Sequence, residues 1–358
     1  MRICILTQPL GPNYGGILQA FALQKVLKDL GHDVTTLRWL PLSPRNPIKT
    51  LRRFLARYIK GNKDIVFFNY EKQLHYTFRE HDRFIDEHLN CVTASAPLRI
   101  GDMSLFDAYI VGSDQVWRPL YSPYIPNLYL DFLGDTPAKR IAYAASFGVD
   151  IWETDERTTG IIRPLAQKFD AISVREESGI KLCEQFLGVQ AQVMPDPTIL
   201  LKAEDYLSLC PPQSKGRTEY IAAYILDNSD KVQRFLDRVA CKSGLPIINI
   251  GCLDWINGVD SLENWLSCIA GARDVITDSF HGTVFSLLFE RNFITLTNST
   301  RGTSRFDTLL KFTGLQDRLF DKEQLDEYDF NLCSINYGPV KEAIRDMRQK
   351  GLSFLRSI

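Results

Sequence analysis

Short apolar strands alternate with helical patterns along most of the chain, and this alternation restricts the fold more than any other feature. The segments "RICILT" (2–7) and "DVTTLRW" (33–39) are typical of buried strands. Between them, "ILQAFALQKVLKDLG" places Leu23, Leu27 and Leu30 at helical spacing, with a glycine at its end. A strand–helix–strand unit of this kind implies a parallel sheet with right-handed crossovers.

The alternation occurs on both sides of a polar segment rich in turn formers, "CPPQSKGRTE" (210–219). The strands expected before this segment are 107–113, 140–146, 171–176 and 191–198. The strands expected after it are 220–226, 246–252, 274–279 and 293–298, with helices near 229–242, 261–271 and from about 283.

The chain has 358 residues, which is too long for one ordinary core. We therefore predict an α/β fold with two Rossmann-like parallel-sheet domains that face each other across a cleft. The expected divisions are an N-terminal domain (1–209), a C-terminal domain (219–335) and a C-terminal helix (336–358) that could pack back on the N-terminal domain. Strand-end motifs of both domains should then point at one cleft.

Composition favours a globular protein and excludes a global attraction to nucleic acid. Hydrophobic residues make up 45% of the chain and charged residues 24%, and the formal net charge is −1. None of the eight cysteines forms a C-x-x-C pair and several lie in apolar runs, so we interpret them as buried reduced thiols, which favours a reducing compartment. The segment "MRICILT" lacks the features of a secretory signal, and no apolar run is long enough to span a bilayer. We expect a cytoplasmic protein without a nucleic-acid partner.

His281 lies in "TDSFHGTVFSLLF" (277–289), between an expected strand and a helix. The first N–H groups of a helix favour an anion, and a histidine there can bind that anion or transfer a proton. Ser279, Gly282 and Thr283 would share such a site. The alternative, equally supported by the residues alone, is a simple helix cap made by Ser279 or Asp278.

Arginines at strand ends suggest an anion site. Arg175 ends the strand "AISVRE", and its planar fork suits a carboxylate or phosphate. The alternative is an internal ion pair with Glu176, Glu177 or Asp196. The segment "TRGTSR" adds Arg301 and Arg305, which form either an anion clamp beside His281 or a solvated loop.

Two further strand-end motifs could bind a sugar. "NYGG" offers Asn13, Tyr14 and Gly15 at a turn where a backbone can approach a ligand closely. "GSDQVW" offers Asp114 as an acceptor or base, Gln115 as an amide and Trp117 as a flat apolar face, although a cap by Ser113 or Asp114 is equally credible.

The basic segment "RNPIKTLRRFLARYIKGNK" (45–63) could lie on an anionic membrane surface or pack as an ordinary amphipathic helix. No cluster of histidines and carboxylates at ligand spacing suggests a metal site.

The ordered set of these segments resembles the polysaccharide pyruvyl transferase family. The resemblance is carried by "NYGGILQAFALQKVLKDLGH", "DAYIVGSDQVW", "SVREESGIKL", "VMPDPTILL", "TDSFHGTVFSLLF" and "SRFDTLLKFTGLQDRL". It implies a fold similar to the GT-B glycosyltransferases. It also implies the transfer of pyruvate from phosphoenolpyruvate to sugar hydroxyls of a surface polysaccharide or its lipid-linked precursor, with a cyclic ketal as the product and no cofactor.

Motif by motif, the resemblance implies that His281 and Arg175 contact phosphoenolpyruvate. Many members have Arg-x-His-Gly where this chain has "SFHG", so Ser279 occupies the place of an arginine and Arg301 or Arg305 could replace it. We assign catalysis to His281, Asp114 and Arg175, with Asp114 as the base for the sugar hydroxyl. His281→Ala and Arg175→Ala should each abolish phosphate release and leave the fold intact.

Two other functions fit the sequence. A GT-B-like glycosyltransferase that uses a nucleotide sugar would need an acidic residue for the ribose, and Asp278 or Glu290 could serve. A non-catalytic glycan-binding protein with the same fold is favoured by the serine at position 279.

Overall fold

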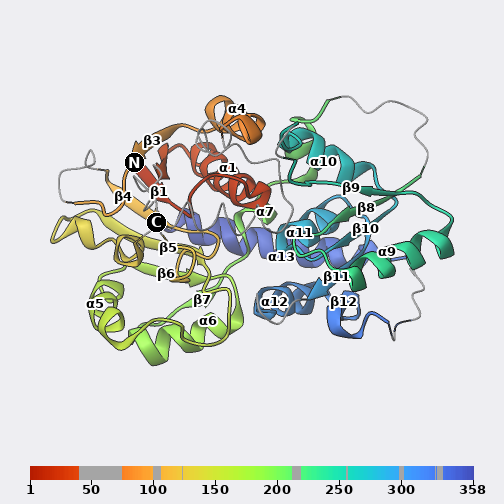
Figure 1. Cartoon of the computed structure of the whole chain (residues 1–358). Helices are drawn as coiled ribbons and strands as arrows, with labels where there is room; N and C mark the ends of the chain where they lie inside the picture. The colour runs from red at the N-terminus through yellow and green to blue at the C-terminus, as the bar shows by residue number, and fades with distance from the viewer. Residues whose placement is uncertain are drawn as a thin grey trace, which may run out of the picture.

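The structure is a computed structural model that describes residues 1–39, 75–99, 106–122, 124–211, 219–254, 257–297, 302–326, 328 and 334–358. The basic segment 45–63 and Arg301 lie outside these residues. The described chain forms two parallel sheets that lie side by side, each flanked by helices (Figure 1). We call the part built on the larger sheet the first unit and the part built on the smaller sheet the second unit.

The first unit contains a seven-stranded sheet whose described strand pairs are all parallel. In spatial order its strands are β3 (Cys91–Ala94), β2 (Asp33–Trp39), β1 (Arg2–Leu6), β4 (Ala108–Val111), β5 (Lys139–Ala145), β6 (Ala171–Val174) and β7 (Gln192–Val193). Its α-helices among the described residues are α1 (Tyr14–Asp29), α4 (Arg79–His88), α5 (Glu156–Ala166), α6 (Glu177–Leu182), α7 (Pro197–Leu200) and α8 (Ala203–Leu207).

The second unit contains a five-stranded parallel sheet. Its strands, in spatial order, are β12 (Leu319–Asp321), β11 (Asn292–Thr297), β10 (Asp274–Thr277), β8 (Ile221–Tyr224) and β9 (Ile247–Asn249). Its helices are α9 (Asp230–Ser243), α10 (Leu262–Gly271), α11 (Phe280–Leu288) and α12 (Ser304–Thr313). The central strands of both sheets are almost wholly apolar because helices cover both faces.

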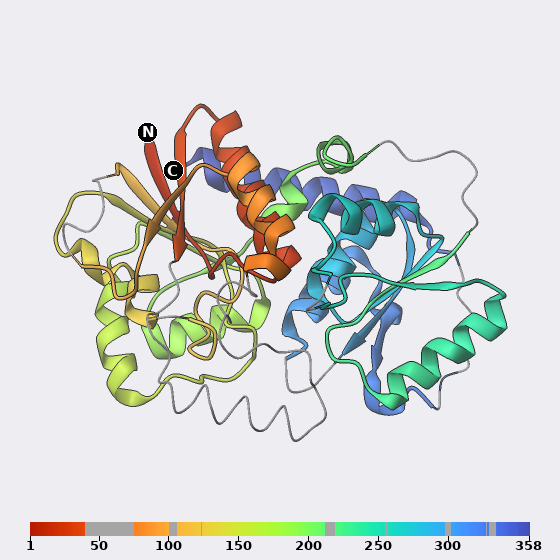
Figure 2. The same cartoon turned by 45° about the horizontal axis from the view of Figure 1, so that its top comes forward.

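The C-terminal helix α13 (Tyr337–Arg356) spans both units (Figures 1 and 2). At its start, the Tyr337 hydroxyl donates to the carbonyls of Ser286 and Arg291 in the second unit. Near its end, Arg348 donates to the carbonyls of Ile199 and Leu201 in the first unit. The helix therefore ties the two units together.

Aromatic side chains also join the units. The ring of Tyr14, at the start of α1, stacks on Trp265 of α10 with 5.4 Å between centroids, and its hydroxyl donates to the carbonyl of Asp260. Tyr224 packs edge-on against both rings. Burial of such large side chains stabilises the junction by the hydrophobic effect.

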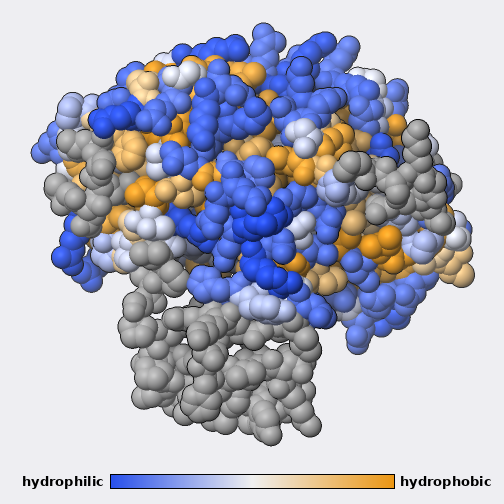
Figure 3. Space-filling view, turned by 90° about the horizontal axis from the view of Figure 1, so that it is seen from above, coloured by the Kyte–Doolittle hydropathy of each residue, from blue (hydrophilic) through white to orange (hydrophobic). Residues whose placement is uncertain are grey.

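None of the helices in the described part of the chain combines the length and the apolar content that a bilayer-spanning segment needs. On the face seen from above, hydrophilic side chains predominate and smaller apolar areas are interspersed among them (Figure 3).

The predicted fold class, two Rossmann-like parallel-sheet units, is confirmed. The strand expected at 33–39 has these bounds in the structure. The strand expected at 191–198 is wrong in length: it ends at Val193, and "DPT" begins helix α7 instead because Asp196 caps it. Helix α11 begins at Phe280, so His281 lies in its first turn and not before it.

Candidate active site

Four strand ends converge between the two units. The chain after β4 leads to Asp114, the chain after β6 to Arg175, and the chain after β7 to Asp196 at the start of α7. In the second unit, the chain after β10 leads to His281 in α11. Because parallel strands present their carboxyl ends on one side of a sheet, residues far apart in sequence meet here.

Arg175 is the centre of an ion network in the first unit. Its Nη1 donates to Oδ2 of Asp196 at 2.8 Å, and its Nη2 donates to Oδ1 of Asp114 at 3.1 Å. Only 3% of the residue is exposed. Burial would lower the pKa of Arg175, but the two carboxylates outweigh this and raise it, so the guanidinium stays charged. The predicted alternative of an internal ion pair with Asp196 is thus what this structure contains.

Asp196 connects the two units. Its Oδ1 accepts hydrogen bonds from the backbone N–H and the hydroxyl of Thr198, at 3.0 and 2.7 Å. Its Oδ2 lies 3.5 Å from Nε2 of His281, which is within range of an ion pair. Burial would raise the pKa of Asp196, but His281, Arg175 and Thr198 together hold it well below its usual value. Asp196 is therefore a carboxylate at any pH near neutrality.

His281 is held between Asp196 and the first turn of α1. It is 5% exposed, and its Nε2 forms no aligned hydrogen bond with the described residues. On its other side, a Cβ added to Gly15 would lie 2.0 Å from Nδ1. Only glycine at position 15 allows the ring to sit there. The motif "NYGG" thus meets the motif "SFHG": the strand-end rule predicted that both face one cleft, but not that Gly15 and His281 are in direct contact.

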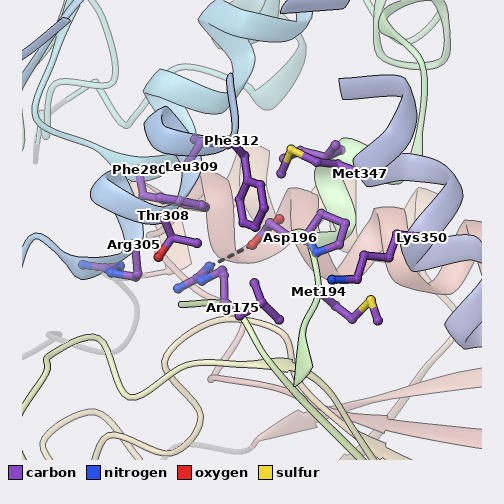
Figure 4. A pocket seen from close by; sticks show the side chains of 13 residues that line it. Arg175, Met194, Asp196, Phe280, Arg305, Thr308, Leu309, Phe312, Met347 and Lys350 are labelled. Carbon is purple, nitrogen blue, oxygen red and sulfur yellow. Dashed lines mark hydrogen bonds and ion pairs between the residues drawn. The ribbon is translucent and has the colours of Figure 1, made fainter. Parts of the chain in front are cut away.

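Arg305 and Arg175 both approach the ring of Phe280 (Figure 4). The guanidinium carbon of Arg175 lies 4.6 Å from the ring centroid, and that of Arg305 lies 6.0 Å from it. Burial and the charge of Arg175 lower the pKa of Arg305 to about 10. The charge of Arg175 thus disfavours the charged form of the buried Arg305, and an anion bound by both would relieve this repulsion.

A small cavity lies between the units beside these arginines. Arg175 and Asp196 line it from the first unit, Phe280 and Arg305 from the second, and Lys350 from α13 (Figure 4). Its volume of about 40 Å³ holds a few water molecules. A larger ligand requires the units to separate slightly or the side chains at its rim to move.

Asp114 has a strained backbone, with φ at 70° in the left-handed region. Its carbonyl accepts hydrogen bonds from the N–H groups of Val116 and Ser146, and these bonds fix the turn after β4. Gln115 is half-buried, and its Oε1 accepts a hydrogen bond from Arg118 at 3.3 Å. Asp114 faces Arg175 in this structure and not open solvent.

Two expected sugar contacts need correction. Trp117 is 1% exposed because its ring stacks on Tyr129 and its Nε1 donates to the carbonyl of Leu128, so it offers no face to a sugar. Tyr14 is 2% exposed because it stacks on Trp265 between the units. Asn13 is exposed at the start of α1, and its side chain makes no capping hydrogen bond to the helix.

The other candidates in α11 have local structural roles. The Ser279 hydroxyl accepts from the N–H of Gly282 at 3.3 Å, so the predicted helix cap is present. Thr283 was expected to contact the bound anion beside His281. Instead it is fully buried, and its hydroxyl shares a hydrogen bond with the hydroxyl of Thr295. A Cβ at Gly282 would lie 2.3 Å from Oγ1 of Thr277, so this glycine allows close helix–strand packing.

The two acidic residues that could bind the ribose of a nucleotide sugar, Asp278 and Glu290, already have partners within the protein. Asp278 accepts hydrogen bonds from the N–H groups of Leu226 and Asp227 and from Lys322. Glu290 pairs with Lys341 at 2.8 Å. No group of three metal-binding side chains occurs in the described part of the chain.

Sequence reasoning missed three contributors to the site: Asp196 as the link to His281, Phe280 as the ring that both arginines approach, and Lys350 at the rim of the cavity. The only signal for Asp196 was "DPT" after an expected strand. Phe280 and Lys350 carry no local signal, because an apolar residue in a helix and a lysine in a tail are common.

Comparison with known proteins identifies one family. The model of the family described as polysaccharide pyruvyl transferase matches residues 13–300, most of the chain. A search of curated proteins found no match.

Among solved structures, UGT89C1 of Arabidopsis thaliana complexed with UDP-L-rhamnose aligns over 99% of this chain and 98% of its own, with 11% identity and a TM-score of 0.48. UDP-GlcNAc 2-epimerase of Methanocaldococcus jannaschii, in complex with UDP-GlcNAc and UDP, aligns over 98% and 99%, with 12% identity and a TM-score of 0.47. The UDP-GlcNAc 2-epimerase of Neisseria meningitidis, bound to UDP-GlcNAc, aligns over 99% of this chain and 100% of its own, with 9% identity and a TM-score of 0.46. These similarities are too low to carry an argument about substrate or reaction.

Proposed function

Because the chain belongs to the polysaccharide pyruvyl transferase family, we propose that it moves a pyruvyl group from phosphoenolpyruvate to the hydroxyls of a sugar. The acceptor would be a sugar of a surface polysaccharide or of its lipid-linked precursor, and the product a cyclic pyruvate ketal. Phosphoenolpyruvate is then a co-substrate, and the reaction uses no further cofactor.

The observation that carries this proposal is the pair of buried arginines around Phe280, beside His281. Phosphoenolpyruvate has a phosphate and a carboxylate, and a guanidinium is the side chain best suited to each. Arg305 would supply the cation that other members carry at position 279. Arg175 would bind the donor while its guanidinium group also interacts with the carboxylates of Asp114 and Asp196.

The proposed chemistry begins at the methylene carbon, which must gain a proton. A sugar hydroxyl then attacks the neighbouring carbon, and Asp114 takes its proton as general base. Phosphate departs as the carbon–oxygen bond breaks, and His281 donates a proton to it or stabilises its charge. A second hydroxyl closes the ketal and loses its proton. In the overall balance, the two sugar hydroxyls lose one proton each. One of these protons makes up for the proton that the methylene carbon gained, and the other is carried away by the departing phosphate.

Asp114 must turn from Arg175 to act as a base. In the structure its Oδ1 accepts a hydrogen bond from Arg175 at 3.1 Å. A donor carboxylate that binds Arg175 would compete for that guanidinium and release the Asp114 carboxylate toward the acceptor. This exchange gives a reason for the donor to bind first.

The direct test is phosphoenolpyruvate binding followed by phosphate release with sugar acceptors. Phosphoenolpyruvate should raise the melting temperature, and UDP-GlcNAc at equal concentration should not. Stabilisation by UDP-GlcNAc alone would favour a glycosyltransferase. No stabilisation by either ligand, and no phosphate release, would favour a non-catalytic glycan-binding protein.

A further inference from the structure

The buried charges beside the cavity provide no net positive charge with which to hold an anionic donor. Three buried carboxylates, Asp114, Asp196 and Glu176, act on the guanidinium group of Arg175. Two of them, Asp114 and Glu176, also act on Arg305, together with the buried guanidinium group of Arg118, so three carboxylates stand against three guanidinium groups. The Glu176 carboxylate accepts hydrogen bonds from the hydroxyl of Ser146 and two backbone N–H groups, so it stays at its place in the network. The buried part of the site therefore has no excess of positive charge.

Lys350 is the remaining cation among the described residues that line the cavity. It lies on α13, one turn after Met347, and both side chains extend along the same wall of the cavity (Figure 4). The side chain is exposed and forms no ion pair with the described residues. Its amine thus lies at the rim, where a ligand that enters would meet it.

The position of Lys350 is fixed by its neighbours in the helix. Arg348 donates to the carbonyls of Ile199 and Leu201 at 3.0 and 2.8 Å. A Cβ at Gly351 would lie 2.6 Å from the side chains of both Leu200 and Tyr143, so the helix packs closely on the first unit. These contacts hold the register of α13 and therefore keep Lys350 over the cavity.

We propose that Lys350 is a donor-binding residue, contributed by the C-terminal helix, that supplies the positive charge the interdomain cavity needs to hold a multiply charged anion. This inference rests on the proposed function, with phosphoenolpyruvate as the anion. The apolar wall formed by Met194, Phe312 and Met347 strengthens the attraction because it lowers the local dielectric constant. Lys350 contacts the donor and takes no part in proton transfer.

The test compares Lys350→Gln, Lys350→Arg and Lys341→Gln. Lys341 is the matched control because it lies on the same helix, pairs with Glu290 and lines no part of the cavity. Binding of phosphoenolpyruvate is measured by calorimetry, and KM and kcat are measured by phosphate release. Lys350→Gln should weaken binding and raise KM roughly 5-fold with kcat unchanged. Lys350→Arg and Lys341→Gln should bind like the wild type, and the defect should shrink at about 0.5 M salt.

Equal binding by the wild type and Lys350→Gln would overturn the assignment of Lys350 and leave the proposed function standing. A lower melting temperature of Lys350→Gln without ligand, not restored in Lys350→Arg, would also overturn it, because the role would then be structural. A wild-type protein that binds no phosphoenolpyruvate would overturn the proposed function and this inference with it.

Discussion

Gly15 of the first unit and His281 of the second approach so closely that a Cβ on residue 15 would lie 2.0 Å from Nδ1. Gly15 belongs to the first turn of α1, and His281 to the first turn of α11. Both helix ends are positive ends of helix dipoles, so their meeting point favours an anion. The contact explains in physical terms why a glycine stands in "NYGG" and a histidine in "SFHG".

Gly15→Ala should therefore displace His281 or push the units apart. We expect phosphate release to fall at least about 10-fold, and the free energy of unfolding to fall by about 1–3 kcal/mol, the usual cost of overpacking. Gly160→Ala in α5 is the control, because nothing lies within 4 Å of its added Cβ. It should raise stability slightly through helix propensity. Equal activity of the two variants would show that the close contact does not matter for the reaction.

The ionised carboxylate of Asp196 should make stability depend on acid pH. Its pKa is lowered in the folded protein from a value of 3.8, so its contribution is complete above about pH 4 and is lost as pH falls toward the folded pKa. Asp196→Asn should cost about 3–5 kcal/mol near neutral pH, because Arg175 loses a buried partner. Urea unfolding between pH 3 and 7 should show this difference shrinking below about pH 4. A difference that is constant with pH would exclude the carboxylate as its source.

Arg175 and Arg305 should respond differently to removal of their charge. Arg175→Gln leaves Asp114 and Asp196 buried without their cation, so we expect a loss of about 3–5 kcal/mol in stability. The sequence-based expectation of an intact fold for Arg175→Ala is revised on this ground. Arg305→Gln removes a charge that burial already disfavours, so its stability loss should be smaller while KM for phosphoenolpyruvate rises at least about 10-fold. Thermal melts and KM measurements of both variants check this. Equal stability loss in the two would contradict it.

The central strands of both sheets could be predicted because they are continuous apolar runs between turn formers. The edge strands β3 and β12 could not. β3 is only four residues long and β12 only three, and in both strands partly buried residues are combined with an exposed one. Neither strand therefore shows a clear apolar periodicity. The strand pairing that creates them is a tertiary property.

Sequence patterns predicted where the candidate site lies and, as alternatives, a few of its contacts, such as the ion pair of Arg175 with Asp196. Arg175 and His281 follow strands that were predicted, and the strand-end rule put them at one edge. Trp117 follows such a strand too, yet its ring is covered by Tyr129 from a later segment. The partnership of Asp196 with His281 depends on how the units meet, and no local pattern encodes that. Exposure of a side chain beyond a strand end is therefore decided by distant residues.

His281 and His81 form the last comparison, since both are buried histidines at the junction of the units. His81 contacts the carbonyl of Gly11 through Nδ1 at 3.0 Å and packs against Tyr14, which is a structural arrangement. Nε2 of both histidines forms no aligned hydrogen bond with the described residues, so this feature does not separate them. His281 differs because its Nε2 lies 3.5 Å from Oδ2 of Asp196, a residue that lines the cavity proposed to hold the donor.

His281→Gln should therefore lower phosphate release by roughly 100- to 10,000-fold, the range for loss of an acid–base group, with a small change in melting temperature. His81→Gln should lower the melting temperature and leave the turnover of the folded enzyme near that of the wild type, measured well below its transition. The two effects should separate because only His281 would touch the reacting atoms. If His281→Gln retains full turnover, the phosphate must leave without help from this residue, and the assignment of its proton would have to move to another group near Arg305.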